Sequence, residues 1–407
     1  MEKINIGIIG LGERGYSLLK SVILEIDYVD VLGVCDIYED RTERGFDIVA
    51  EKRGNKPVRT NDYKVLLGMP EIDAIVITSA WESHLQIAME AMNAGKYVGV
   101  EVGGAYSIDD CWKLVHTYEK TGTPCMMMEN CCYGRNELMV LNMVRQGIFG
   151  DIVHCAGGYH HDLRHEISFG NENRHYRLRN YLSRNCENYP THELGPIAKV
   201  LDINRGNRML SLNSVASRAA GLSDFIKRKK PEDTRLLNAE FKQGDIVTTI
   251  IKCARGETIV LTLDTTLPRA YSRGFCVRGT KGMYEEQTHS IFLDGVHHEY
   301  DYNWSKQWGN ADKYREEYEH PIWKKYLTEG VKGGHEGMDW LVFNAFFESV
   351  ANKTQTPIDV YDSAAWMSIS TLSEQSIACG GATVYIPDFT NGKWLQPQTK
   401  AEGKYSL

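Results

Sequence analysis

The chain of 407 residues has no apolar run close to the roughly 20 residues that a membrane-spanning helix needs, so we expect no membrane partner. It also has no basic excess, because 54 acidic residues outnumber 46 basic ones and give a net charge of −8. A general nucleic-acid binder carries a basic stripe, and we therefore expect no nucleic-acid partner. A short basic run, Lys227–Pro231, is interpreted as an exposed loop.

The ten cysteines form no CxxC or CxxxC pair, and several of them, such as Cys35, lie in apolar runs. We expect buried free thiols of a reducing compartment rather than a disulfide framework. No basic and apolar leader precedes the first predicted strand, which favours a cytoplasmic protein, with the periplasm as the alternative if a signal peptide has been removed. Five histidines match no zinc spacing, and we expect no metal site; they are His154, His160, His161, His165 and His175.

Length and composition indicate a globular enzyme of more than one domain. At about 150 residues per domain the chain predicts two or three domains. Its 42% hydrophobic and 25% charged residues are ordinary for such a protein. Tyrosine is unusual, with 22 copies against 11 phenylalanines, which indicates either a surface that binds polar rings or compositional drift.

The first third of the chain alternates predicted strands with predicted helices. This alternation predicts a parallel sheet with right-handed crossovers. The predicted strands are Ile4–Ile9, Val29–Cys35, Ala74–Ile77, Tyr97–Val100 and Pro124–Met128, and the predicted helices are Gly15–Leu24, Glu39–Arg53, Ser83–Ala94 and Ile108–Thr121.

The turn after the first strand carries a G-x-G-x-x-G pattern at Gly10, Gly12 and Gly15. The three glycines allow a tight turn, close approach of the backbone to a pyrophosphate, and close helix–strand packing. Asp36 ends the second strand, where a carboxylate accepts the ribose hydroxyls of NAD and repels the extra phosphate of NADP. Arg41 keeps NADP open as a second choice, but the pattern favours NAD.

The remainder of the chain predicts a largely antiparallel sheet. We therefore expect an α/β fold of two domains. Residues 1–130 should form an N-terminal Rossmann domain with a doubly wound parallel sheet. Residues 131–407 should form a C-terminal α+β domain with a large, mostly antiparallel open sheet, whose last helices can pack back on the Rossmann domain. An apolar outer sheet face commonly pairs subunits, so we expect a homo-oligomer, a dimer or larger. The predicted strands are Ile152–Tyr159, Ile246–Cys253, Thr258–Asp264, Gly274–Arg278 and Ser290–Leu293, the predicted helices are Trp340–Val350 and Ser363–Ala378, and the aromatic stretch Tyr300–Tyr326 reads as a surface excursion.

Thr78–His84, Ala94–Val98 and Glu101–Gly103 resemble the glucose-fructose oxidoreductase/inositol dehydrogenase superfamily, which implies a Rossmann domain followed by a second α/β domain with an open sheet. In the dehydrogenases of that superfamily the last tripeptide reads Glu-Lys-Pro, and its lysine assists proton transfer at the substrate carbinol. Here Val102 and Gly103 stand in place of the lysine and the proline. Valine moves no proton, so the resemblance argues against ordinary net dehydrogenation. The dehydrogenases' Asp-x-x-x-His helix aligns with Glu193 and Ile197 and is altered too.

Five further segments look like glycoside hydrolase family 109, the NAD-dependent α-N-acetylgalactosaminidase group, and the match runs over nearly the whole chain. A glycine is more usual in that family at the position of Glu193. The segments are Met127–Arg135, Val140–Gly147, Gly157–Arg164, Asn188–Pro196 and Gly333–Asp339.

The resemblance implies that the cofactor is NAD and that it is used without net oxidation. Hydride leaves sugar carbon 3, a base removes the proton on carbon 2, and the aglycone leaves carbon 1. Water then adds to the unsaturated sugar, and the returning hydride restores carbon 3. An NAD-dependent glycosidase family is a known exception to hydrolysis by paired carboxylates. The substrate would be a small-molecule glycoside.

The resemblance also implies the site residues. Tyr189, Pro190, Thr191 and His192 would contact the sugar near the nicotinamide. Pro190 fixes the entry of a predicted helix over 193–201, and Thr191 can cap it. The helix start favours a neutral imidazole at His192, which suits a proton acceptor. The predicted catalytic residues are His192, Tyr189 and Tyr159, and the predicted substrate contacts are Tyr159, Arg177, Tyr189, Pro190, Thr191, His192 and Tyr271.

The predicted cofactor contacts follow strands of the parallel sheet, since ligands bind at the carboxyl ends of such strands. His84 could equally be a packing residue at a helix start. Arg174 or Arg179 could take the place of Arg177, and Tyr133 is a weaker candidate near the cofactor. The predicted contacts are Gly10, Gly12, Arg14, Gly15, Asp36, Trp81, His84, Glu101, Val102, Asn130 and Tyr189.

Two other functions compete with a redox-neutral glycosidase. The first is an NAD-dependent dehydrogenase or oxidoreductase of sugars or polyols, against which Val102 speaks. The second is a non-catalytic protein that binds NAD or a sugar. Aglycone release without NADH accumulation distinguishes the glycosidase from both.

Overall fold

A computed structural model describes residues 3–298, 300, 303–396 and 403–407. The chain divides into two compact units. The first comprises residues 1–133, 324–365 and 398–407, and the second comprises residues 134–323 and 366–397. Residues 324–365, placed in the C-terminal domain by sequence, thus group with the first unit.

The first unit contains a six-stranded parallel sheet in the order β3-β2-β1-β4-β5-β6. This order confirms the predicted doubly wound Rossmann sheet. The inner strands are almost continuously apolar and buried, because helices cover both faces of such a sheet. The strands are β1 (Ile4–Ile9), β2 (Val29–Cys35), β3 (Val58–Thr60), β4 (Ala74–Ile77), β5 (Tyr97–Val100) and β6 (Cys125–Met127).

Several helices of the first unit have clear local stop and start signals. Helix α5 (Ile108–Thr121) begins after Ser107, whose side chain accepts a hydrogen bond from Asp110 N, and ends at Gly122 with φ +68°. The other helices that lie wholly in this unit are α1 (Glu13–Ser21), α2 (Glu39–Arg53), α3 (Tyr63–Leu67), α4 (Trp81–Asn93) and α14 (Met338–Asn352). Helices α13 (Pro321–Glu329) and α15 (Val360–Ala378) contribute residues to both units.

The second unit contains an eight-stranded sheet in the order β13-β12-β11-β7-β10-β9-β8-β14. Strands β7 and β10 run parallel, and the other neighbouring pairs are antiparallel, which confirms the predicted mostly antiparallel sheet. Sequence reasoning missed β8, β12 and β14. The strands are β7 (Ile152–His160), β8 (Met209–Ala216), β9 (Ile246–Cys253), β10 (Thr258–Asp264), β11 (Cys276–Gly279), β12 (Gly282–Glu285), β13 (Ser290–Leu293) and β14 (Val384–Tyr385).

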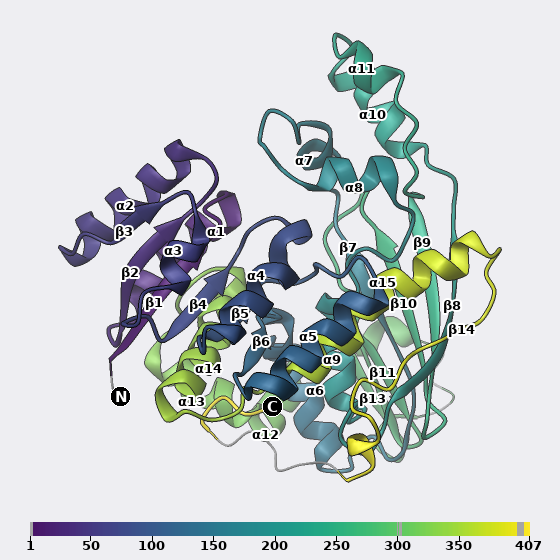
Figure 1. Cartoon of the computed structure of the whole chain (residues 1–407). Coiled ribbons are helices and arrows are strands. Elements are labelled where there is room, and N and C mark those ends of the chain that lie inside the picture. The colour runs from purple at the N-terminus through teal and green to yellow at the C-terminus, as the bar shows by residue number, and fades with distance from the viewer. Residues whose placement is uncertain (1–2, 299, 301–302, 397–402) are drawn as a thin grey trace. The chain divides into compact units, whose positions relative to one another are not determined.

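A hydrophobic cluster in the second unit joins the ends of β7 and β10 to short helices that gather at one end of the sheet (Figure 1). Tyr159, Tyr181 and Leu263 belong to this cluster and are buried. It gives the end of β7 a rigid base. The helices of the unit are α6 (Arg135–Arg145), α7 (Arg164–Ser168), α8 (Arg177–Ser183), α9 (Thr191–Val200), α10 (Gly221–Lys229), α11 (Thr234–Leu237) and α12 (Arg315–Tyr318).

The structure corrects two of the loop predictions. The run Lys227–Pro231 is not an exposed loop, because its first three residues form the last turn of α10 and Lys230 is buried with its ammonium on Ser168 O and Glu172. The stretch Tyr300–Tyr326 is not wholly a surface excursion, because Tyr318 and Tyr326 are buried on α12 and α13. Residues 299, 301 and 302, two of them within that stretch, lie outside the described residues.

The cysteines follow the prediction of free thiols. All ten are free, and nine of them are buried. Within the described parts of the chain, we find no helix with the length and apolar character needed to cross a membrane.

Candidate active site

The glycine turn between β1 and α1 has the geometry that a dinucleotide needs. Gly10 adopts φ +98°, and a Cβ there would lie 2.4 Å from Ser79 N. A Cβ on Gly15 would lie 2.1 Å from Gly10 O, so both positions require glycine. At Gly12, the N-cap of α1, an added Cβ would meet only the guanidinium of Arg41, at 3.5 Å. The turn therefore leaves open space at the helix N-terminus, which fits a pyrophosphate.

Asp36 is held by the backbone at the end of β2. Its two carboxylate oxygens accept hydrogen bonds from Leu11 N at 2.7 Å and Tyr38 N at 3.0 Å, and the residue is 7% exposed. A carboxylate has about four acceptor positions, so acceptor capacity remains for ribose hydroxyls. Arg41 lies 3.9 Å from Asp36, so a cation sits close to this carboxylate. These contacts fit NAD.

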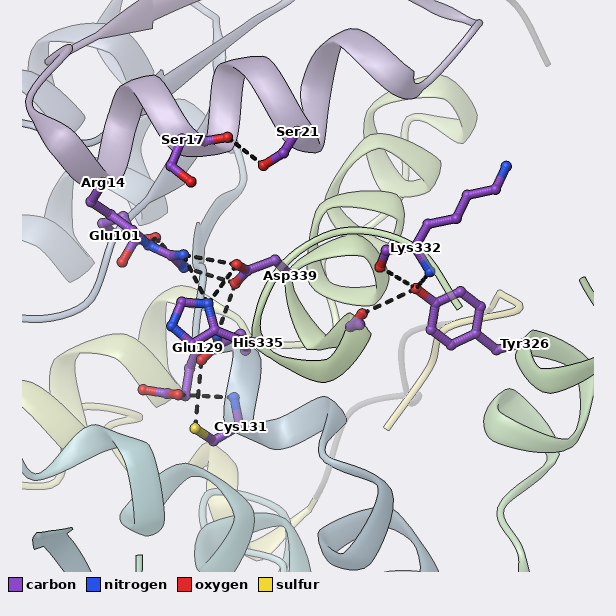
Figure 2. A network of polar contacts seen from close by, with 12 residues as sticks. Arg14, Ser17, Ser21, Glu101, Glu129, Cys131, Tyr326, Lys332, His335 and Asp339 are labelled. Atoms are coloured by element: carbon purple, nitrogen blue, oxygen red, sulfur yellow. Dashed lines mark hydrogen bonds and ion pairs between the residues drawn. The ribbon is translucent and has the colours of Figure 1, made fainter. Parts of the chain in front are cut away.

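Arg14, in the first turn of α1, is clamped between two carboxylates (Figure 2). Its guanidinium donates two hydrogen bonds of 2.8 Å to Asp339 and one of 3.1 Å to Glu101. His335 Nδ1 lies 2.8 Å from the same Asp339 carboxylate, and the amide of Asn130 donates to it at 2.8 Å. Three segments that are distant from Arg14 in sequence thus fix its guanidinium beside the glycine turn.

Asp339 is the centre of this network and is 2% exposed. Burial raises the pKa of its carboxyl, but the hydrogen bonds from Arg14 and His335 outweigh burial and hold the pKa well below the ordinary value. The loop before α14 is strained, since His335 (φ +51°) and Glu336 (φ +57°) both adopt left-handed backbone before Gly337 (φ +94°). The sequence identified Gly333–Asp339 as a family segment but did not connect it to Arg14.

The turn after β5 explains one departure from the dehydrogenase pattern. Gly103 adopts φ +83°, which the proline ring forbids, and a Cβ there would lie 2.5 Å from the indole nitrogen of Trp81. Val102 is 3% exposed. His84 is 1% exposed, with Nε2 2.9 Å from Ser79 O and Nδ1 3.3 Å from Gly103 O. The ring of His84 therefore connects the turns after β4 and β5. This contact supports a packing role for His84, and the cofactor role stays a prediction.

Tyr133, the weaker candidate, is fully buried and donates its hydroxyl hydrogen to Tyr405 O at 2.9 Å. This contact gives it a structural role in the first unit.

Four rings form a compact cluster in the second unit. Tyr159 and Tyr189 stack with ring centroids 4.2 Å apart. His192 meets both tyrosines edge-on, at 5.2 Å from Tyr159 and 4.7 Å from Tyr189. Tyr271 meets Tyr159 edge-on at 6.4 Å and is 50% exposed. The structure thus brings together the three predicted catalytic residues and one predicted substrate contact, as an amphipathic surface of the kind that binds sugar rings.

Of the three candidate arginines, Arg177 is the one whose guanidinium lies over this cluster. Its guanidinium carbon is 4.9 Å from the centre of the Tyr189 ring, and its Nε is 2.7 Å from Glu166. Arg177 is 7% exposed, whereas Arg174 and Arg179 are exposed. Burial lowers the pKa of Arg177, but the neighbouring Tyr176 and Glu166 outweigh burial and raise it well above the ordinary value. The guanidinium is therefore a permanent cation.

Helix α9 starts earlier than the sequence predicted. It begins at Thr191, Pro190 is its N-cap, and no side chain caps it, so the predicted capping role of Thr191 is wrong. Thr191 is 2% exposed inside the first turn. Pro196 has no N–H, so it donates no helical hydrogen bond to the carbonyl of His192. His192 is thus fixed on a short helix between two prolines.

Glu193, next to His192, is fully buried, and the second unit supplies both a cationic partner and space for its side chain. Its carboxylate lies 3.0 Å from Arg273 Nε, and Arg273 also pairs with Glu137. A Cβ on Gly157 would lie 2.6 Å from Glu193 Cγ, so strand β7 makes room for the larger side chain. Arg273 lies two residues after Tyr271, so this ion pair connects the Tyr271 loop to the first turn of α9.

His161 is a member of the cluster that sequence reasoning missed. Its Nδ1 lies 2.8 Å from the hydroxyl of Tyr159, and its ring meets Tyr271 edge-on at 5.1 Å. Burial and the charge of Arg177 lower the pKa of His161. The spacing was a usable signal, because His161 comes two residues after Tyr159, directly past the end of β7, and alternate residues of an extended chain lie on the same face.

Comparison with known proteins relates both units to families. Residues 133–396 match the family model described as "Glycosyl hydrolase 109, C-terminal domain", and residues 4–129 match "Oxidoreductase family, NAD-binding Rossmann fold". A glycosyl hydrolase family 109 protein of Stenotrophomonas maltophilia is 41% identical over 99% of this chain and 93% of its own length. An α-N-acetylgalactosaminidase of Tannerella forsythia is 38% identical over 96% of this chain and 87% of its own length.

Solved structures share the fold at low sequence identity. Levoglucosan dehydrogenase in complex with NADH aligns with a TM-score of 0.69 at 16% identity, over 95% of this chain and all of that one. Scyllo-inositol dehydrogenase from Lactobacillus casei, with NAD(H) and scyllo-inositol, aligns with a TM-score of 0.64 at 15% identity, over 94% of this chain and 99% of that one. At this identity the likeness establishes the fold alone.

Proposed function

The chain belongs to glycosyl hydrolase family 109 and is an NAD-dependent glycosidase, and from that premise we propose that it hydrolyses α-N-acetylgalactosaminides in a redox-neutral cycle. The cycle is the oxidation, elimination, hydration and reduction set out above. The observation that carries this proposal is the cluster of Tyr159, Tyr189 and His192, whose rings contact one another beside a buried arginine. The relative from Tannerella forsythia is an α-N-acetylgalactosaminidase, which supports N-acetylgalactosamine as the sugar of the substrate.

NAD, when bound, supplies a reversible hydride acceptor for the sugar. In this proposal Gly10, Gly12 and Gly15 make room for the pyrophosphate, and Asp36 accepts hydrogen bonds from the ribose. Arg14 is held as a fixed positive charge by Asp339 and Glu101. The remaining proposed contacts of the first unit are Trp81, His84, Glu101, Val102 and Asn130.

The protein groups that act on the sugar come from the second unit. We assign removal of the proton on carbon 2 to His192, which is held in the first turn of α9 between Pro190 and Pro196. The guanidinium of Arg177 offers a fork of donors to sugar hydroxyls or to the acetamido carbonyl. Tyr189 and Tyr271 offer ring faces and hydroxyls to the sugar, and Thr191 and Pro190 fix the approach to the helix.

The oligomer and the compartment are part of the same proposal. We propose a homo-oligomer that pairs through one face of the second sheet, where Val215 and Ile250 are exposed apolar residues. Sedimentation of the purified protein tests this, and a monomer at all concentrations contradicts it. We place the protein in the cytoplasm, because its free cysteines suit a reducing compartment. Fractionation of the native host tests that assignment.

The decisive experiment follows aglycone release and absorbance at 340 nm in parallel, using purified holoenzyme and an aryl α-N-acetylgalactosaminide. Aglycone release without net accumulation of NADH supports the proposal. Stoichiometric NADH contradicts it in favour of a dehydrogenase. Silence with this substrate and with a panel of other sugars and linkages contradicts it in favour of a binding protein.

A further inference from the structure

The proposed cycle creates a need for a proton acceptor at the carbinol. When hydride leaves carbon 3, the hydroxyl on that carbon must lose its proton for the ketone to form. Val102 stands where the related dehydrogenases carry the lysine that assists this transfer, and valine has no group to accept a proton. The proton must also come back, because the returning hydride regenerates the hydroxyl. The cycle therefore needs a group that stores one proton while the sugar is oxidised.

We propose that Tyr159 and His161 form a proton relay that takes the carbon-3 hydroxyl proton, stores it on His161, and returns it with the hydride. This inference rests on the proposed function. His161 acts through Tyr159 and is a positioning residue, whereas Tyr159 is the group that contacts the sugar.

The first support is the hydrogen bond itself. Tyr159 Oη and His161 Nδ1 are 2.8 Å apart, within the range of a good O–H to N hydrogen bond. The Tyr159 ring is fixed on one face by Tyr189 and lies in the hydrophobic cluster at the end of β7. The residue is 6% exposed, so its ring has little freedom to turn the hydroxyl away from His161.

The second support is the charge around His161, which keeps the imidazole neutral and its Nδ1 available. Burial comes first and lowers the pKa of His161, and the guanidinium of Arg177 lowers it further. In the tautomer of the neutral imidazole that carries its hydrogen on Nε2, Tyr159 is the donor and Nδ1 the acceptor. A weak base of this kind gives its proton back readily, which suits a step that is reversed in every cycle. The groups that face His161 are Tyr159, Tyr271, His192, Arg177, Glu166 and Asp162.

The proton balance of the relay closes. In the forward direction the sugar O–H bond breaks as the Tyr159 oxygen gains that proton, while the Tyr159 hydroxyl proton moves to His161 Nδ1. The hydride leaves carbon 3 with its electron pair and NAD accepts it, so the sugar loses one hydride and one proton. On return both transfers run backward, and no proton is consumed. Glu166 and Asp162, which raise the pKa of His161, stabilise the transient imidazolium.

The test is a single-turnover experiment on holoenzyme, with the transient at 340 nm followed from pH 5 to 9. We expect His161→Gln to slow the transient about 100-fold or more, the range for loss of general acid–base assistance. In the wild type the transient should weaken as pH falls through the pKa of His161, and the variant should lose that dependence. His154→Gln is the matched control, because His154 lies on β7, the strand that His161 directly follows, with its Nδ1 2.9 Å from Thr258 Oγ1. This variant should leave the rate unchanged.

Two further measurements separate the relay from a structural role. Tyr159→Phe should slow the transient as much as His161→Gln, and the double variant should lose little more, because the two groups act as a unit. In ¹⁵N NMR of histidine-labelled protein without substrate, the Nδ1 resonance of His161 should shift and titrate differently in Tyr159→Phe. The dissociation constant for NAD should stay at the wild-type value in each variant.

The outcomes divide cleanly. An unchanged transient in His161→Gln, or an unchanged His161 resonance in Tyr159→Phe, overturns the relay. Net NADH from the wild type overturns the redox-neutral cycle but not the relay, since a dehydrogenase also removes a carbinol proton and the variant must still be slow. A wild type that binds the sugar without any hydride transfer overturns the proposed function and the relay together, since no carbinol proton then moves.

Discussion

The two units hold their functional groups by different physical means. In the first unit the backbone defines the site, through glycines at φ values or distances that no side chain tolerates and a carboxylate fixed by backbone N–H groups. In the second unit rings define it, through the contacts of Tyr159, Tyr189 and His192. The difference predicts that changes in the first unit alter cofactor affinity, whereas changes in the second alter turnover with the cofactor still bound.

The largest effect should come from His192→Ala. Loss of the proposed base should lower kcat by about 100- to 10,000-fold, the usual range for proton-transfer groups, and leave the dissociation constant for NAD unchanged. Steady-state kinetics and fluorescence titration of NAD measure the two quantities. If His192→Ala keeps full activity, His192 has no part in the mechanism. If it loses NAD instead, the separation between the units fails.

A first-unit counterpart is Arg14→Leu, which removes the cation from Asp339 and Glu101. Removing one partner of a fully buried ion pair costs roughly 3–5 kcal/mol of unfolding free energy. Arg14 is partly exposed, so we expect Arg14→Leu to cost less than that. Urea unfolding and NAD titration should show lower stability and weaker NAD binding. Lys113→Leu, which removes the exposed ion pair with Asp109 on α5, is the control, and it should change neither quantity comparably.

The same network predicts an acid limit. Because the pKa of Asp339 is depressed in the folded chain, its contribution to stability is present above the unfolded value of about 3.9 and is lost as pH falls toward the folded pKa. Asp339→Asn should therefore reduce the dependence of unfolding free energy on pH below about pH 4. An identical acid profile in wild type and variant would show that Asp339 is not the group responsible.

Arg177→Lys should have a smaller effect, confined to the sugar. Lysine keeps the charge but loses the planar fork, so we expect KM to rise about tenfold with kcat changed less. Arg179→Lys, on the exposed face of α8, is the matched control. Equal KM values for both variants and the wild type would remove Arg177 from the sugar contacts.

The smallest expected effect is at the ribose. Asp36→Asn removes the charge that opposes a 2′-phosphate while Arg41 remains 3.9 Å away. We expect NAD affinity to fall and the preference for NAD over NADP to shrink, each by about tenfold, which corresponds to roughly 1.4 kcal/mol. The effect stays below the roughly 1.5–3 kcal/mol of a full hydrogen bond to a charged group, because asparagine keeps one acceptor oxygen. Titration with both dinucleotides measures the ratio, and an unchanged ratio argues against this role of Asp36.

The first unit was more predictable from sequence because its signals are local. Gly10, Gly15 and Asp36 follow consecutive strands at a spacing that the chemistry of a dinucleotide requires, and the structure gives each glycine a steric reason. Asp339 escaped this reasoning because its partner Arg14 is 325 positions away in sequence, and no local pattern reports such a pair.

The second unit was predictable mainly through resemblance. Nothing local in the sequence places Tyr159 against Tyr189, since the two come from different elements and meet only in the tertiary fold. His161 was grouped with other histidines, although its i+2 spacing from Tyr159 was available. The predicted cap at Thr191 is wrong because Pro190 takes the N-cap position and Thr191 is already the first residue of the helix.

The central claim is a redox-neutral cycle in which the proton on carbon 2 is removed and replaced. Hydrolysis of an aryl α-N-acetylgalactosaminide in D₂O, followed by NMR of the released sugar, tests this directly. The account predicts deuterium at carbon 2 of the product and no net NADH. A product that keeps its original hydrogen at carbon 2 would contradict it.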